Sequence, residues 1–350
     1  MEEEEAAGRL WPYETGFQQW FEGLQAFGDP DARAAAIADG QEPETIGGFQ
    51  AVLEAFGWLF GNFIEVFYNV AYALSHPGLW LNWADREALT RFIYYGGSVE
   101  FFFVVLTIIL IVAIIGFINN RVMWGTVVGL EGVANFIGRL FAWAGLFMVL
   151  QQILIVFMQR VFASSQISLG FGTAFTKDIS WWAEMLKFEN ALVVTLCCTY
   201  TFVQGGHVRV DLVYAAIGHR AKRVVDMFGS LFFMMPVAII VWMYSWFFLW
   251  RHLVVPNPSA SESLDRLMMK SRALRWNVET IGFSPNGFDA YFLFKVLLVA
   301  FTGLVFLQAV AFFFRSYLEW KEGEESAGKY LDRDVLDQGE AEMAAPEHLA

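Results

Sequence analysis

Few residues of this chain combine the type and the position that chemistry would need. The five histidines fall at the ends of apolar runs, in loops or near the last residue: His76, His207, His219, His252 and His348. A b-type haem in a membrane protein is held by histidines on facing transmembrane helices. No pair of these histidines meets that condition, so the sequence predicts a haem-free protein.

Other catalytic and metal-binding patterns are also missing from the sequence. Cys197 and Cys198 are adjacent in an apolar run, which gives neither a disulfide framework nor the paired spacing of a zinc site. The glycines of 116–138 lack the lysine and threonine of a phosphate-binding loop. No Ser/His/Asp set and no paired carboxylates can be argued. We therefore expect no enzyme activity, no cofactor and no metal site.

One polar motif separates two apolar segments, and it reads Gly205-Gly206-His207-Val208-Arg209-Val210-Asp211-Leu212. Alternating polar residues near a helix end are common, so His-x-Arg-x-Asp alone is weakly specific. Two interpretations stay open. Arg209 contacts lipid headgroups and Asp211 caps the following segment, or the two side chains clamp another segment or subunit.

The elements that must position this motif are membrane helices. The chain has 350 residues, of which 57% are hydrophobic and 17% aromatic, and its mean hydropathy is +0.45. These values lie outside the range of soluble globular proteins. The sequence therefore predicts an all-α integral membrane protein and excludes a soluble enzyme.

A helix needs about 20 mostly apolar residues to cross a bilayer. Four segments qualify clearly: 101–118, 140–158, 227–250 and 296–314. A fifth segment, 178–204, qualifies if its polar upstream half, with Glu184 and Lys187, is included. Pro236 should kink the helix of 227–250. Residues 46–75 carry Glu54 and Glu65 in an apolar stretch, so an amphipathic helix on the membrane surface is preferred there over a further span.

Charge is distributed in three blocks within a net charge of -13. Residues 1–95 hold 15 acidic and 4 basic residues, and residues 316–350 hold 10 acidic and 3 basic residues. Such acidic ends would repel nucleic acid and anionic lipid, so neither is expected to bind them. The basic loop of 205–223 is expected on the cytoplasmic side, because positive residues accumulate there.

These observations predict four parts of the chain. They are an acidic N-terminal extension with amphipathic interfacial helices at 1–95, an additional transmembrane helix and connector at 96–130, a four-helix membrane domain at 131–318, and an acidic cytoplasmic tail at 319–350.

Three short elements, read together, carry a resemblance to a known family. They are Arg160-Val161-Phe162 after one span, Trp181-Trp182 with Glu184 at the opening of the next, and His207, Arg209 and Asp211 after it. In this order and spacing, residues 131–318 resemble the small membrane subunit of tripartite ATP-independent periplasmic (TRAP) transporters. The added span at 101–118 and the long loop of 251–287 depart from that pattern.

The resemblance implies a function at the level of a complex. A periplasmic solute-binding protein would deliver an organic acid or similar solute to a large membrane subunit driven by a sodium or related ion gradient. The small subunit would brace that large subunit in the bacterial inner membrane. The candidate motif and contact residues are Arg160, Trp181, Trp182, Glu184, Lys187, Gly206, His207, Arg209, Asp211, Lys295 and Gln308. The alternatives are a haem-free anchor subunit of a redox or assembly complex and a channel-like protein acting alone.

Overall fold

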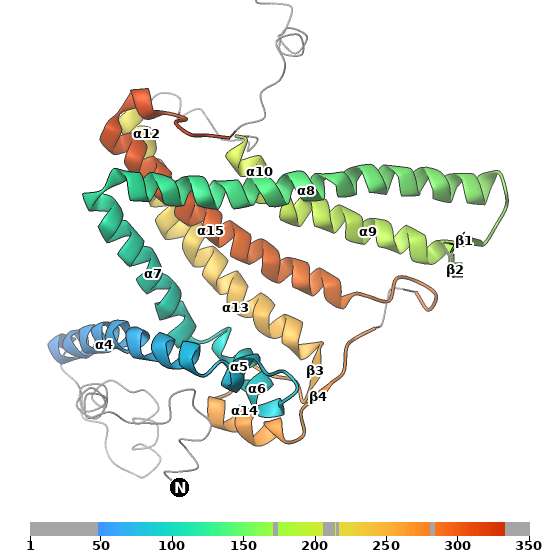
Figure 1. Ribbon diagram of the computed structural model, residues 1–350, viewed down its shortest axis with the longest axis horizontal. Coiled ribbons are helices and arrows are strands. Elements are labelled where there is room, and N and C mark those ends of the chain that lie inside the picture. The colour runs from blue at the N-terminus through green and yellow to red at the C-terminus, as the bar shows by residue number, and fades with distance from the viewer. Residues whose placement is uncertain (1–47, 171–173, 206–213, 215–216, 281–283, 333–350) are drawn as a thin grey trace, which may run out of the picture. The chain divides into compact units, whose positions relative to one another are not determined.

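The computed structural model describes residues 48–170, 174–205, 214, 217–280 and 284–332 (Figure 1). Within these ranges, five helical segments are long and apolar enough to cross a membrane. They are α7 (Val99–Ile118), α8 (Asn120–Arg160), α9 (Ile179–Leu196) with α10 (Cys198–Val203), α12 (His219–Gly229) with η1 (Ser230–Met234) and α13 (Met235–Arg251), and α15 (Phe292–Glu322). The predicted all-α integral membrane fold is confirmed.

The chain divides into two compact units, which are described separately. The larger unit takes in residues 112–249 and the described residues from 278 onward. In it, α8 and α9 lie side by side, and α15 packs against α8, α9, α10 and α12 (Figure 1). In the apolar 18-residue stretch of α15, 39% of the residues are buried inside the protein, whereas in that of α8 only 6% are buried. α15 is therefore the internal helix of this unit, while α8 presents most of its apolar side chains outward.

α8 and α10 approach each other closely at a glycine. A Cβ atom on Gly138 would lie 2.0 Å from the Cβ of Tyr200, and the thiol of Cys197 donates to the Gly138 carbonyl at 3.4 Å. Small residues allow such close backbone contact between membrane helices. The glycine at this position of α8 therefore sets the distance between the two helices.

A π-helical turn, η1, precedes Pro236, which is the second residue of α13. Proline has no N–H to donate, and its ring clashes with the carbonyl four residues earlier in a regular α-helix. The wider turn relieves that clash, and the Met235 N–H bonds the Ser230 carbonyl instead of a regular α-helical partner. The predicted kink at Pro236 stays a prediction, and the structure shows a π-helical turn directly before α13.

A β-hairpin joins α8 to α9. Its strands are β1 (Gln166–Gly170) and β2 (Ala174–Asp178), which pair antiparallel with Gln166 opposite Asp178. The Ser168 and Thr176 hydroxyls face each other across the strands at 2.9 Å. This connection brings the start of α9 back toward the end of α8, so that the two helices can run antiparallel.

The smaller unit combines two segments that are far apart in sequence, residues 48–111 and 250–277. It contains α4 (Gly48–Ser75), α5 (Gly78–Leu81), α6 (Arg86–Tyr95), the first part of α7, β3 (Val254–Val255), α14 (Leu264–Ser271) and β4 (Arg275–Trp276). α6 packs on α14, and the Arg86 guanidinium donates to the Arg272 carbonyl at 2.6 Å. Trp250 contacts Trp83 and Phe92, with ring centroids 6.0 and 5.8 Å apart.

Two predicted segments differ from the structure in extent. α8 begins at Asn120, well before the predicted start at 140, because the Asn119 side chain caps it by accepting the Arg121 N–H and the glycines that follow are tolerated in the helix. α4 is one 28-residue helix and is not among the five candidate spans. Its position on the membrane surface stays a prediction.

Candidate functional site

Glu184 of α9 forms a clamp on the segment that leads into α15. Its carboxylate accepts the Ser284 hydroxyl at 2.8 Å and the Phe288 backbone N–H at 2.9 Å. A Cβ on Gly287 would lie 2.1 Å from the Glu184 Oε2, so the carboxylate occupies the space that a side chain would need. A carboxylate that is 9% exposed keeps its charge at tolerable cost only with such donors. Glu184 thus ties the start of α9 to the start of α15.

Neighbouring aromatic and charged residues reinforce this end of the unit. The Trp181 indole N–H donates to Asp289 at 3.3 Å, and its ring meets that of Phe288 at 5.6 Å. Lys295 of α15 pairs with Glu279 and lies 5.1 Å from the ring centroid of Phe248. Three of the predicted contact residues, Trp181, Glu184 and Lys295, therefore hold segments of this chain together.

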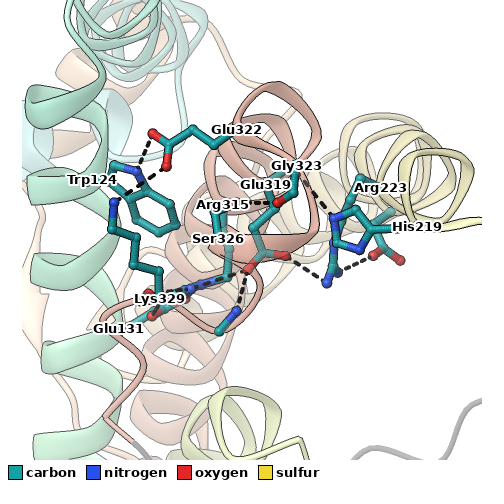
Figure 2. Close-up of polar contacts among 12 residues, drawn as sticks. Trp124, Glu131, His219, Arg223, Arg315, Glu319, Glu322, Gly323, Ser326 and Lys329 are labelled. Carbon is teal, nitrogen blue, oxygen red and sulfur yellow. Dashed lines mark hydrogen bonds and ion pairs between the residues drawn. The ribbon is translucent and has the colours of Figure 1, made fainter.

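A second group of charges, here called the charged cluster, joins α8, α12 and α15 and consists of Glu131, Arg223, Arg315 and Glu319 (Figure 2). The Arg315 guanidinium binds the Glu131 carboxylate through two hydrogen bonds, with Nε to Oε1 at 2.6 Å and Nη2 to Oε2 at 2.5 Å. The two side chains are 9% and 7% exposed. Burial of both charges is costly, and this two-bond geometry offsets much of that cost.

The remaining members of the charged cluster link α12 to α15. Arg223 pairs with Glu319 at 2.7 Å and with Asp226 at 3.1 Å, and Glu319 is only 2% exposed. The Tyr214 hydroxyl also donates to Asp226, at 2.8 Å. The short helix α12 is therefore fixed against the last turns of α15 by ions from both helices.

The segment that follows α15 folds back over the charged cluster. Gly323, at a φ of 93°, ends α15, and the Lys329 carbonyl accepts from Arg315 at 3.0 Å (Figure 2). Glu322 accepts the Trp124 indole N–H at 3.0 Å. This segment thus brings additional partners to the buried arginine and to α8.

Asp332 ties the last described residues to α8 and α10. Arg139 of α8 binds its carboxylate at 2.8 and 3.0 Å, and Asn135 and Gln204 donate to its backbone carbonyl. The hydrogen bonds from Arg139 hold the pKa of Asp332 below its ordinary value. Gln204 directly precedes the glycines of the polar motif, so this network lies next to the motif in sequence.

The structure separates the remaining predicted residues. Arg160 is exposed at the end of α8, Lys187 is exposed on α9, and Trp182 and Gln308 are buried. Gly206, His207, Arg209 and Asp211 lie outside the described residues, so their predicted roles stay predictions.

Sequence reasoning did not single out the charged cluster. Its four members come from three helices that are remote in sequence, and Arg315 directly follows the predicted span of 296–314. The available signal was Glu131, a carboxylate in the glycine-rich apolar stretch before the predicted span at 140–158. An acidic residue there requires a partner, and only the fold identifies Arg315 as that partner.

The described residues contain no group of three or more His, Cys, Asp or Glu side chains able to hold a metal ion. Their charged groups mainly join helices through ion pairs and hydrogen bonds. The fold and these contacts define a polytopic α-helical membrane protein whose helices are fastened at both ends of the larger unit.

Comparison with known families gives a closer assignment. The family model of the DctQ component of tripartite ATP-independent periplasmic transporters matches residues 170–255, which take in the Glu184 clamp residue, the polar motif, α12 and α13. This region is therefore similar to the small permease of TRAP transporters, and the match supports the resemblance that the sequence motifs predicted. Neither a curated protein nor a solved structure matches the chain.

Proposed function

We propose that this chain is the small membrane subunit of a TRAP transporter and braces a large transport subunit in the bacterial inner membrane. The observation that carries the proposal is the family match over residues 170–255. In this scheme, a periplasmic solute-binding protein delivers an organic acid or similar solute, and the large subunit moves it inward with an ion gradient. The chain itself is a scaffold and not an enzyme.

The arrangement of charges supports a stationary role. Glu131, Arg315 and Glu319 are buried, Arg223 is half-buried, and all four are paired between helices. Charges engaged in this way resist relative motion of the helices, because separating a buried ion pair leaves an uncompensated charge. A moving transport element needs interfaces that slide, whereas a brace needs helices that stay together.

The outer surface of α8 supports contact with another apolar surface. Phe136, Trp143 and Phe147 are 68%, 60% and 58% exposed. Large exposed apolar patches mark membrane or protein contacts. In the proposed assembly, this surface is shared between lipid and the large membrane subunit.

The proposal predicts that the tagged chain copurifies with the large membrane subunit of its transporter after co-expression. Reconstituted liposomes should take up solute only when both membrane subunits and the solute-binding protein are present. The measurement is radiolabelled or fluorescent solute uptake with an imposed ion gradient. Empty liposomes and liposomes with this chain alone are the controls.

Three results would count against this function. Solute flux through liposomes holding this chain alone would indicate a channel. Visible absorbance of a bound chromophore in the purified complex would indicate a redox anchor. Absence of the large subunit from gently solubilised material would remove the proposed partner.

A further inference from the structure

A groove runs between α8 and α9 on the larger unit. Its volume is about 480 Å³, and its wall consists of Ala144, Phe147, Leu150, Gln151, Leu154, Trp182, Met185, Phe188, Glu189 and Leu192. Phe147 and Leu150 are 58% and 52% exposed, so the groove opens to the outside of this unit. Most of the lining is apolar, which suits an apolar occupant.

Two polar atoms in the groove wall have no hydrogen-bond partner among the described residues. They are the Glu189 Oε2 and the Trp182 Nε1. Glu189 is 7% exposed and Trp182 is 8% exposed. Gln151 is engaged differently, because its amide donates to the Trp182 carbonyl at 2.8 Å. A buried carboxylate oxygen left without a donor is costly, so a donor supplied from outside the chain would be strongly favoured.

The depth of Glu189 in its helix limits what that donor can be. At a rise of 1.5 Å per residue, the distance along the helix axis is about 15 Å from Ile179, the first residue of the span, to Glu189. It is about 21 Å from Glu189 to Val203, the last residue. The hydrocarbon layer of a bilayer is about 30 Å thick. Where the helix crosses this layer, a lipid headgroup reaches Glu189 only by leaving the surface of the bilayer, and the crosslinking test below distinguishes that case.

A second copy of this chain is a poor source of the donor. Lys187 is the cation of α9 at a comparable depth, and it already takes part in an interaction within the chain. Lys295 and Arg315 of α15 are paired with Glu279 and Glu131. In the membrane-spanning helices described, these three basic residues thus already have interaction partners within the chain.

We propose that the α8–α9 groove receives a helix of the large membrane subunit and that a lysine or arginine of that helix binds Glu189. This inference rests on the proposed function, because it names the surface through which the scaffold holds its partner. The apolar flank of the incoming helix packs between Phe147 and Phe188. Charge complementarity at the carboxylate fixes its register, since an ion pair in hydrocarbon tolerates little displacement.

The test uses Glu189→Leu in the full chain, co-expressed with the large subunit. A docking carboxylate without an internal partner should be dispensable for the fold, so the isolated variant should melt at or above the wild-type temperature. Recovery of the large subunit on the tagged chain should fall by about tenfold or more, which corresponds to at least about 1.4 kcal/mol. Glu189→Gln, which keeps the shape and removes the charge, should also reduce recovery.

Asn190→Leu is the matched control, because Asn190 is an exposed polar residue of α9 that does not line the groove. It should leave recovery of the large subunit unchanged. A photo-crosslinking residue at Leu150 should label the large subunit in the wild-type complex. Labelling of a second copy of this chain, or of lipid only, would overturn the proposal.

The outcomes separate this inference from the proposed function. If the wild-type chain brings down no large subunit, the proposed function fails. If the wild type and both Glu189 variants bring down the large subunit equally, only the assignment of the groove fails. Lower melting of isolated Glu189→Leu with unchanged recovery would mean that Glu189 serves the fold of this chain.

Discussion

At the scale of single residues, the buried ion pair of Glu131 and Arg315 shows why this protein carries charge among apolar helices. Burying an isolated ion in a low-dielectric interior costs much free energy. A guanidinium–carboxylate pair joined by two hydrogen bonds offsets much of that cost and fixes the relative orientation of the two side chains. The pair joins α8 to α15 at positions 184 residues apart. Its contribution is therefore to specify which helices meet.

Removing one partner of this pair should be strongly destabilising. Glu131→Leu leaves Arg315 buried with fewer partners, and we expect a loss of about 3–5 kcal/mol in the free energy of unfolding. Thermal unfolding of the detergent-solubilised chain measures the effect. The double variant Glu131→Leu/Arg315→Met should recover much of the loss, because it leaves neither charge alone.

An exposed ion pair provides the comparison. Glu87 pairs with Arg91 at 3.3 Å, and its side chain is 55% exposed. Glu87→Gln should change stability by only about 0–1 kcal/mol, since solvent screens the charge. Equal losses for Glu131→Leu and Glu87→Gln would contradict the role given to the buried pair.

At the scale of elements, the distance between helices depends on where small residues fall. Gly138 of α8 faces Tyr200 of α10, and an added Cβ would overlap the tyrosine Cβ at 2.0 Å. Gly132 lies on the same helix, and a Cβ added there would meet no atom within 4 Å. The two glycines therefore make a matched pair for separating interhelix packing from helix propensity.

Gly138→Ala and Gly132→Ala should have opposite effects on stability. Gly138→Ala forces α8 and α10 apart and should cost about 1–3 kcal/mol. Gly132→Ala should stabilise α8 by about 0.5–1 kcal/mol, because alanine loses less backbone entropy in a helix. Melting temperatures of the two variants test this, and a rise for Gly138→Ala would show that α10 is not held by close contact.

At the scale of the whole molecule, the segments that depart from the family pattern belong largely to a unit of their own. Residues 48–111 and 250–277 form the smaller unit, and the family match begins at 170 and ends at 255. The larger unit holds α9, α12 and most of α13, together with the charged cluster and the Glu184 clamp. The region that matches the small-permease family model lies mostly in the larger unit, and the smaller unit draws on two separate stretches of the sequence.

The orientation of the chain in the membrane is predicted from the basic segment of 205–223, whose last five residues lie in α12 and not in a loop. Arg209, Arg220, Lys222 and Arg223 lie within 205–223, and positive residues are retained on the cytoplasmic side. Reporter insertions in 212–222 should therefore report the cytoplasm, and insertions in 255–285, for example after the exposed Ala260, should report the periplasm. The reverse pattern of alkaline phosphatase and fluorescent protein activity would overturn this orientation.

The sequence by itself determined the class of protein, the five candidate spans found among the described residues, and the resemblance that the family match over residues 170–255 supports. Each of these depends on local properties: apolar run length, the proline at 236, and short motifs such as Trp181-Trp182 with Glu184. Hydropathy is a sum over neighbours in the chain, so it can be read without a fold. The glycine-rich start of α8 was missed because glycine lowers helix propensity, whereas a cap at Asn119 and its apolar neighbours sustain the helix.

Only the tertiary structure decided which charges are paired and which are available. Glu131 finds Arg315, and Glu184 finds the backbone of Phe288, across separations of 184 and 104 residues. Glu189 resembles Glu184 in the sequence, five residues along the same helix, yet its Oε2 finds no donor among the described residues. The physical reason is that pairing depends on the distance between atoms of different helices. That distance cannot be derived from the residue types along one helix.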